Sequence, residues 1–188
     1  MVQEVDDGTA RPTLVVMVGL PATGKTTVAR QIEVERRALR LTPDDWMIPL
    51  FNDSDAGGRR DVLEGRFVWL AMKALGAGID VILDFGVWSK DERSALRSLA
   101  QEAGAACELR YVTVDHYEQL RRIAERRVGN EQDWTFDITS EELVQYRAGF
   151  QEPDAEELMS SEIDRPPDGH SSWRGWAAER WPTSIDDR

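Results

Sequence analysis

The sequence predicts an α/β fold in which a parallel sheet of four or five strands lies between two layers of helices. Three observations support this prediction. Short apolar runs rich in β-branched residues recur along the chain, as in strands that are buried on both faces. Longer segments with helical spacing of apolar residues separate these runs, an alternation that is typical of parallel sheets. A glycine-rich loop joins the first run to the first helical segment.

The first apolar run and the loop after it carry the most specific motif in the chain. We expect a buried strand from Leu14 to Gly19 and a helix from Lys25 to about Glu35. Between them, Gly19 to Thr26 (GLPATGKT) fits the pattern G-x-x-x-x-G-K-[ST] at every fixed position. Such a loop binds phosphate because successive backbone N–H groups point inward and the helix dipole adds positive charge. The sequence therefore predicts a nucleoside triphosphate site, whereas a plain glycine turn would leave Lys25 as a solvated side chain.

Two side chains of this loop are expected to act on the triphosphate directly. Lys25 can reach the outer phosphates, and the Thr26 hydroxyl can be a ligand of Mg²⁺. The loop residues expected to bind the nucleotide are Gly19, Leu20, Pro21, Ala22, Thr23, Gly24, Lys25 and Thr26.

Composition narrows the classes of function. The 188 residues suffice for one α/β domain, and the net charge of −12 disfavours a nonspecific binder of nucleic acid, which needs a basic face. Cys107 is the only cysteine, so neither a disulfide framework nor a cysteine-based metal cluster is expected. No apolar run approaches the ~18 residues of a membrane helix, and the acidic start MVQEVDDGTA does not resemble a signal peptide. We therefore expect a cytoplasmic monomer or homodimer that does not bind membranes.

The other elements follow from the same kinds of pattern. Strands are expected at residues 38–42, Ile79–Phe85 and Glu108–Val114, with a possible short edge strand at Ser161–Arg165. Helices are expected to begin after cap residues, namely Thr42, Ser89, Asp115 and Thr139. One more helix is expected from about Arg59 to Leu75, and the residues of its buried stripe are Val62, Phe67, Leu70 and Leu75.

These elements divide the chain into three parts. We expect a flexible N-terminus at residues 1–12 and one domain at residues 13–165, with a lid at about 115–135. Residues 166–188 form a tryptophan-rich C-terminal extension that is expected to pack on the body of the domain.

Carboxylates follow three of the expected strands. Because ligands bind beyond the carboxyl ends of parallel strands, these groups and the phosphate loop should converge on one edge of the sheet. Asp44 and Asp45 could instead complement a helix N-terminus, and Asp45 suits that role better. Asp84 ends an apolar strand, as the Walker B acid of a nucleotide-binding protein does, so we expect it to have a functional role. It could instead merely cap the following turn. Asp115 is interpreted as an ordinary N-cap.

The arginine-rich segment LRRIAERR allows two interpretations. Such a charge run is usually a solvated face. Arg122 and Arg126 lie four residues apart, however, so they share one face of the expected helix. On a lid, arginines neutralise charge on a transferring phosphoryl group, and the phosphate loop favours this second interpretation.

Four motifs, GLPATGKTT, LTPDDW, VILDFGVWSKDER and LRRIAERR, resemble the small P-loop kinase-like ATPases known as AAA domains. This group lies near polynucleotide 5′-kinases, zeta toxins, chloramphenicol phosphotransferase and gluconate kinases. The resemblance covers roughly Leu14 to Pro153 and implies the three-layer P-loop NTPase fold, with ATP and Mg²⁺ as cofactors. It implies roles for six residues: Lys25, Thr26 and Thr27 on the triphosphate and Mg²⁺, Asp44 as the general base, Arg122 against the adenine, and Arg126 on the phosphates as a lid closes. Asp84 would orient Mg²⁺ or the acceptor.

One departure from the family pattern bears on the acceptor. The polynucleotide kinases of this group carry an arginine three residues beyond the base, where this chain has Met47. We therefore expect an ATP-dependent phosphotransferase acting on a hydroxyl of a small molecule. The residues expected to contact that acceptor are Asp45, Trp46, Met47 and Trp88. Two alternatives stay open: a 5′-hydroxyl nucleic-acid kinase, and an NTP-dependent switch or interaction protein without kinase activity.

Overall fold

A computed structural model describes residues 11–129, 139–159 and 162–185, with side chains except at 126–129 and 140. The described chain contains one sheet of four parallel strands in the order β2-β3-β1-β4. The strands are β1 (Thr13–Val18), β2 (Leu39–Leu41), β3 (Val81–Leu83) and β4 (Ala106–Tyr111). The predicted α/β class and parallel sheet are thus confirmed.

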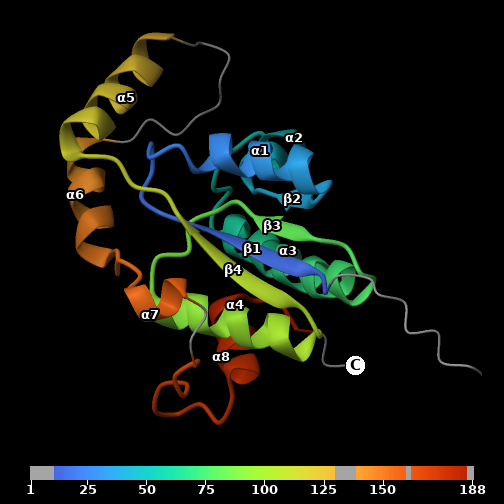
Figure 1. Ribbon diagram of the computed structural model, residues 1–188. Coiled ribbons are helices and arrows are strands. Elements are labelled where there is room, and N and C mark those ends of the chain that lie inside the picture. Colours follow the sequence, from blue (N-terminus) through green and yellow to red (C-terminus); the bar gives the residue numbers. More distant parts are fainter. Residues whose placement is uncertain (1–10, 130–138, 160–161, 186–188) are drawn as a thin grey trace, which may run out of the picture.

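Helices cover both faces of this sheet (Figure 1). The helices are α1 (Lys25–Arg36), α2 (Asp44–Phe51), α3 (Arg59–Gly76), α4 (Lys90–Glu102), α5 (His116–Gly129), α6 (Ser140–Gly149), α7 (Ala155–Leu158) and α8 (Trp173–Arg180). Figure 1 shows α1 on one face of the sheet and α3, α4 and α8 on the other. No helix of the described chain is both long enough and apolar enough to cross a membrane.

Strand β1 explains why the fold needs helices on both sides. Its side chains alternate between two separate apolar clusters. Leu14, Val16 and Val18 pack in the cluster shared with α3 and α4, whereas Val15 and Met17 pack against α1. All five are fully buried. A strand buried on both faces therefore appears in the sequence as a continuous apolar run without alternation.

Three sequence-based predictions about local structure are wrong. Residues 162–165 form no strand, and the sheet of the described chain ends at β2 and β4. Thr42 does not cap α2, because the helix begins one residue later and its N-cap is Pro43, which has no side-chain donor or acceptor. Val62 of α3 is 42% exposed, whereas Phe67 and Leu75 of the predicted stripe are buried and Glu64 is buried with them. The predicted caps Ser89 and Thr139 are both confirmed, and each forms a capping box.

The tryptophan-rich segment packs directly on the domain core. Trp173 and Trp181 are buried in the same apolar cluster as α3 and α4. The chain after α8 lies so close to α3 that a Cβ on Gly65 would come within 1.9 Å of the Pro182 carbonyl oxygen. Arg66 also donates to the Thr183 carbonyl at 3.1 Å. Residues 173–183 are therefore part of the packed body of the domain.

Candidate functional site

The loop after β1 has a backbone that only certain residues can adopt. Gly19 has a φ of 146°, and a Cβ at this position would lie 2.3 Å from the Val112 carbonyl oxygen. Gly24, the N-cap of α1, has a φ of 102°. Ala22 also has a positive φ of 61°, which is uncommon outside glycine and concentrates at functional sites. The glycines of the motif are thus required by backbone geometry and close approach.

The same loop presents an anion-binding helix terminus. Because the N-cap is a glycine, no side chain at that position satisfies the first N–H groups of α1. Lys25 Nζ donates to the Leu20 carbonyl at 2.9 Å, and Thr23 Oγ1 donates to the same oxygen at 2.9 Å. The Lys25 side chain therefore lies along the loop, within reach of a group bound at the helix terminus.

Asp84 lies beside Thr26 at the end of β3. The Thr26 hydroxyl is 3.5 Å from Asp84 Oδ1, and Arg40 donates to Oδ2 at 3.0 Å. Burial raises the pKa of Asp84 above its ordinary value, while the hydrogen bond and charge of Arg40 oppose this shift. The side chain of Asp84 is 1% exposed, so it needs the fixed positive partner that Arg40 provides.

Thr26 and Asp84 form a donor set that suits Mg²⁺. Both offer hard oxygen ligands, and Mg²⁺ in nucleotide enzymes is typically held by one or two protein oxygens together with substrate phosphates. Within residues 11–129, 139–159 and 162–185, no group of three or more His, Cys, Asp or Glu side chains forms a metal centre by itself. Mg²⁺ at this site would therefore depend on phosphate oxygens.

A cavity of about 610 Å³ joins the phosphate loop to the predicted acids. The predicted residues that line it are Pro21, Ala22, Gly24, Lys25, Thr26, Thr27, Asp44, Asp84 and Trp88. The other lining residues are Asp55, Arg60, Asp61, Glu64, Phe85, Gly86, Glu92, Tyr146 and Arg180. The convergence expected from the parallel sheet is therefore present for the loop, Asp44 and Asp84.

Asp44 enters this cavity beside an arginine of α3. Arg60 donates two hydrogen bonds to Asp44 Oδ1, at 3.1 and 3.0 Å, and its Nε lies 3.3 Å from Glu64. The Asp44 side chain is 56% exposed, whereas that of Glu64 is 8% exposed. Arg60 thus fixes the direction of Asp44 and leaves Oδ2 without a bond from this arginine.

Glu64 is the most strongly perturbed carboxyl of the cavity wall. Burial raises its pKa from 4.5 to about 7, and Arg60 and Arg180 act in the opposite sense. A carboxyl that is perturbed in this way and lies in a cavity is a candidate functional residue. The same burial means that ionising Glu64 costs folding free energy.

We expect Glu64→Gln to change the pH dependence of stability. The native state holds the Glu64 proton more tightly than the unfolded chain, so this contribution to stability is fully present below about pH 4.5 and is lost as the pH rises through about 7. The loss should be at most about 3 kcal/mol. Glutamine cannot ionise, so the melting temperature of the variant relative to the native protein should rise between pH 5 and pH 8. The exposed Glu102 of α4 supplies the control Glu102→Gln, for which this difference should stay constant. Parallel pH profiles for native protein and Glu64→Gln would contradict the assignment.

Three residues predicted to contact the acceptor do not line the cavity. Asp45 lies beside Arg40 instead, 2.5 Å from its Nη2. Trp46 is 43% exposed and packs edge-on against Phe67 at 5.4 Å between ring centroids. Met47 is 1% exposed and belongs to the packed face of α2. Helical geometry explains this, because successive residues of α2 point about 100° apart and only Asp44 faces the cavity.

The arginine-rich helix α5 contacts the backbone of the phosphate loop. Gln119 donates to the Pro21 carbonyl at 2.7 Å, and Arg122 donates to the Thr23 carbonyl at 3.0 Å. Arg147 of α6 holds the other end of the Gln119 amide. Arg122 is therefore beside the nucleotide loop, although it does not line the cavity. The side chain of Arg126, predicted to contact the phosphates, lies outside the described side chains, and residues 130–135 of the predicted lid lie outside the described residues.

Sequence reasoning missed several residues of this site. Arg60 and Glu64 stand four apart at the start of α3, a spacing that could have indicated a helical ion pair. Arg40, Tyr146 and Arg180 carry no such signal, because their partners lie far away in the sequence or on other elements.

A comparison with protein families identifies the kind of domain. The family model described as AAA domain matches residues 14–153, which includes the phosphate loop, Asp44, Asp84 and α5. The chain belongs to this AAA domain family. The comparison with curated proteins gave no significant match.

Solved structures of kinases and of an RNA repair complex share the fold. A chain of the Pnkp1/Rnl/Hen1 RNA repair complex has a TM-score of 0.61 at 20% identity, with 77% of this AAA domain chain and 45% of that chain covered. The Mycobacterium tuberculosis APS kinase CysC, in complex with AMPPNP and APS, has a TM-score of 0.54 at 18% identity, covering 90% and 95%. A sugar kinase from Janibacter has a TM-score of 0.53 at 13% identity, covering 95% and 100%. This AAA domain chain thus spans about half of the first of these proteins, and at such identities the likeness shows the fold alone.

Proposed function

We propose that this AAA domain protein is an ATP-dependent phosphotransferase that moves the γ-phosphoryl group to a hydroxyl of a small molecule. The observation that carries the proposal is that Lys25, Thr26, Asp44 and Asp84 line the same cavity. A phosphate-binding loop and a separate carboxylate in one cavity are the parts that phosphoryl transfer to a hydroxyl requires. The APS kinase with a similar fold was solved in complex with AMPPNP, which supports ATP as the donor of the phosphoryl group.

The residues around the donor neutralise and orient the triphosphate. The N–H groups at the start of α1 and the ammonium of Lys25 would offset charge on the β- and γ-phosphates. Thr26 and Asp84 would hold Mg²⁺, which supplies electrostatic stabilisation of the developing phosphate charge. Arg40 keeps Asp84 in place for this role, through the hydrogen bond of 3.0 Å.

Asp44 is the candidate general base. Its carboxylate lines the cavity, and the two hydrogen bonds from Arg60 to Oδ1 orient it. The other oxygen, Oδ2, would accept the proton of the acceptor hydroxyl as the hydroxyl attacks the γ-phosphorus in line with the leaving ADP. Arg126 and Arg122 remain candidates for contact with the phosphates and the adenine when the nucleotide is bound.

The lining of the cavity favours a small acceptor without phosphate groups. The volume of about 610 Å³ falls in the range of small-molecule sites, about 300–1,000 Å³. Six carboxylates line the wall against one lysine and two arginines, Arg60 and Arg180, and both arginines are paired with carboxylates. This balance would repel a nucleic-acid backbone. Met47, at the position of the phosphate-binding arginine of polynucleotide kinases, is buried away from the cavity.

A transfer screen with γ-labelled ATP and Mg²⁺ tests the proposal. The panel contains neutral sugars, nucleosides, amino alcohols, hydroxylated antibiotics and an oligonucleotide with a 5′-hydroxyl. We expect labelling of a neutral or cationic small molecule and none of the oligonucleotide. Labelling of the oligonucleotide alone would favour the nucleic-acid kinase. Tight ATP binding with no labelled product would favour the switch protein.

A further inference from the structure

One cavity residue comes from a segment beyond the part that matches the AAA domain family. The family match ends at residue 153, whereas Arg180 is the last residue of α8 and lines the cavity. Helix α8 is held in place by its buried first residue, Trp173, by its buried C-cap, Trp181, and by its packing on α4. Arg180 is therefore presented to the cavity by a well-packed element.

Arg180 binds the glutamate that organises the start of α4. Its Nε and Nη2 each lie 2.7 Å from Glu92 Oε1. The other carboxylate oxygen, Oε2, accepts hydrogen bonds from the backbone N–H groups of Trp88, at 2.7 Å, and Ser89, at 3.0 Å. The Glu92 side chain is 8% exposed, so little water reaches it. Its negative charge is therefore stabilised mainly by these hydrogen-bond partners. Glu92 thus links Arg180 to the turn that carries Trp88.

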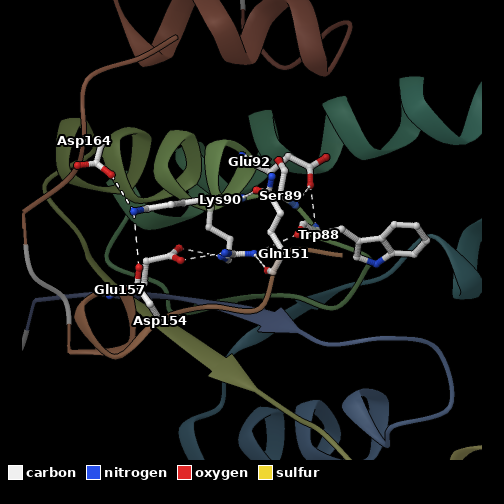
Figure 2. A network of polar contacts seen from close by, with 9 residues as sticks. Trp88, Ser89, Lys90, Glu92, Gln151, Asp154, Glu157 and Asp164 are labelled. Atoms are coloured by element: carbon white, nitrogen blue, oxygen red, sulfur yellow. Dashed lines mark hydrogen bonds and ion pairs between the residues drawn. The ribbon is translucent and has the colours of Figure 1, made fainter. Parts of the chain in front are cut away.

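The turn that carries Trp88, called here the Trp88 turn, is also held by hydrogen bonds to the Trp88 carbonyl (Figure 2). Arg93 donates to the Trp88 carbonyl at 3.2 Å, and the Gln151 N–H donates to the same oxygen at 3.0 Å. Arg93 is fully buried and makes a two-point contact with Glu157, at 2.8 and 2.9 Å. Arg93 therefore fixes one side of the turn from within the core. Glu92 and Arg180 fix the other side from the cavity.

The indole of Trp88 points away from this network, as Figure 2 shows, and forms part of the cavity wall. It packs against the ring of Tyr146 with 4.9 Å between centroids. The backbone of Gly86 lies so close that a Cβ there would be 2.8 Å from the indole nitrogen. The position of this aromatic wall is thus set by the backbone of the turn, because the ring itself has little freedom to adjust.

We propose that Arg180 is a positioning residue of the acceptor site: through Glu92 it holds the Trp88 turn, and thereby the aromatic wall that the acceptor contacts. This inference rests on the proposed phosphotransfer function and assigns the C-terminal segment a role in acceptor recognition. Without Arg180, Glu92 loses its positive partner, turns toward water and releases the N–H groups of Trp88 and Ser89. The acceptor then meets a mobile wall, while the phosphate loop is untouched.

Amide hydrogen exchange and steady-state kinetics test this chain of contacts. Arg180→Gln should speed exchange at the Trp88 and Ser89 amides by about tenfold or more, since these bonds now open locally. It should also raise KM for the hydroxyl acceptor that the protein accepts as substrate by about tenfold or more, and leave KM for ATP and kcat within about threefold. Arg180→Lys, which keeps a charge near Glu92, should recover much of both effects.

Arg174 of the same helix supplies the matched control. It is exposed and pairs with Glu102 at 3.4 Å, away from the cavity. Arg174→Gln should change neither the exchange rates nor either KM. Equal changes in the two variants, unchanged exchange in Arg180→Gln, or faster exchange with an unchanged acceptor KM would each overturn the proposal.

The exchange result also separates this inference from the proposed function. It needs no acceptor, so it reports on Arg180 even if the protein transfers phosphate to nothing. Should the native protein bind Mg²⁺-ATP and label no compound, the phosphotransferase proposal fails and takes the acceptor role of Arg180 with it. Should it label a compound with equal KM in the native protein and in Arg180→Gln, only the positioning inference fails.

Discussion

Lys25→Ala should abolish most of the stabilisation that Mg²⁺-ATP confers on this protein. A ligand that binds only the native state raises its stability by about 2.7 kcal/mol at 100 times Kd. The ammonium of Lys25 would make charge-assisted hydrogen bonds to phosphate, each worth about 1.5–3 kcal/mol. A loss at the upper end of this range should weaken ATP binding by about 100-fold. At the same ATP concentration, the 100-fold case leaves about 0.4 kcal/mol of stabilisation.

The measurement is the melting temperature with and without Mg²⁺-ATP. Lys25→Ala should change the melting temperature of the free protein little, because losing the hydrogen bond from the ammonium to the loop carbonyl of Leu20 costs about 1 kcal/mol. Lys73, an exposed residue of α3 over the Trp69 ring, gives the control Lys73→Ala, which should respond to ATP as the native protein does. A full ATP response in Lys25→Ala would contradict the assignment of the loop as the nucleotide site.

Sequence alone predicted those features that depend on neighbouring residues. The phosphate loop could be located because its glycines meet backbone requirements within one short segment, such as the φ of 146° at Gly19. The caps at Ser89 and Thr139 could be located for the same reason, since each bonds a backbone N–H three residues further along. The parallel sheet followed from fully buried β1 and from the alternation of strands and helices.

The partners of the acids could not be predicted, because they are set by contacts between distant elements. Asp44 and Asp45 are neighbours in one motif, yet Arg60 of α3 binds the first and Arg40 of β2 binds the second. Which acid faces the cavity is decided by the rotation of α2 on the sheet, and the motif LTPDDW contains no information on that rotation. Glu92 shows the same limit: its cap on Ser89 is local, but its bond to Arg180 spans 88 residues.

The partners of the two acids also sharpen the test of catalysis. Asp44→Asn keeps an oxygen that can accept from Arg60, so the side chain should stay in place while it loses basicity. Phosphate transfer should then fall by about 10²–10⁴-fold, with ATP affinity nearly unchanged, because Asp44 would act on the acceptor.

Asp45→Asn is the matched variant within the pair. The Asp45 side chain is 50% exposed, and its contact with Arg40 lies outside the cavity. Arg40 also keeps its bonds to Glu33 and Asp84. This substitution should therefore cost up to about 1 kcal/mol of stability and leave transfer within about threefold of the native rate. Both variants are compared by transfer rate to one accepted substrate beside ATP affinity. An inactive Asp45→Asn with a fully active Asp44→Asn would reverse the assignment within the pair. If both variants transfer phosphate at the native rate, no carboxylate of this motif is the base, and the base assignment proposed here is wrong although the protein is a phosphotransferase.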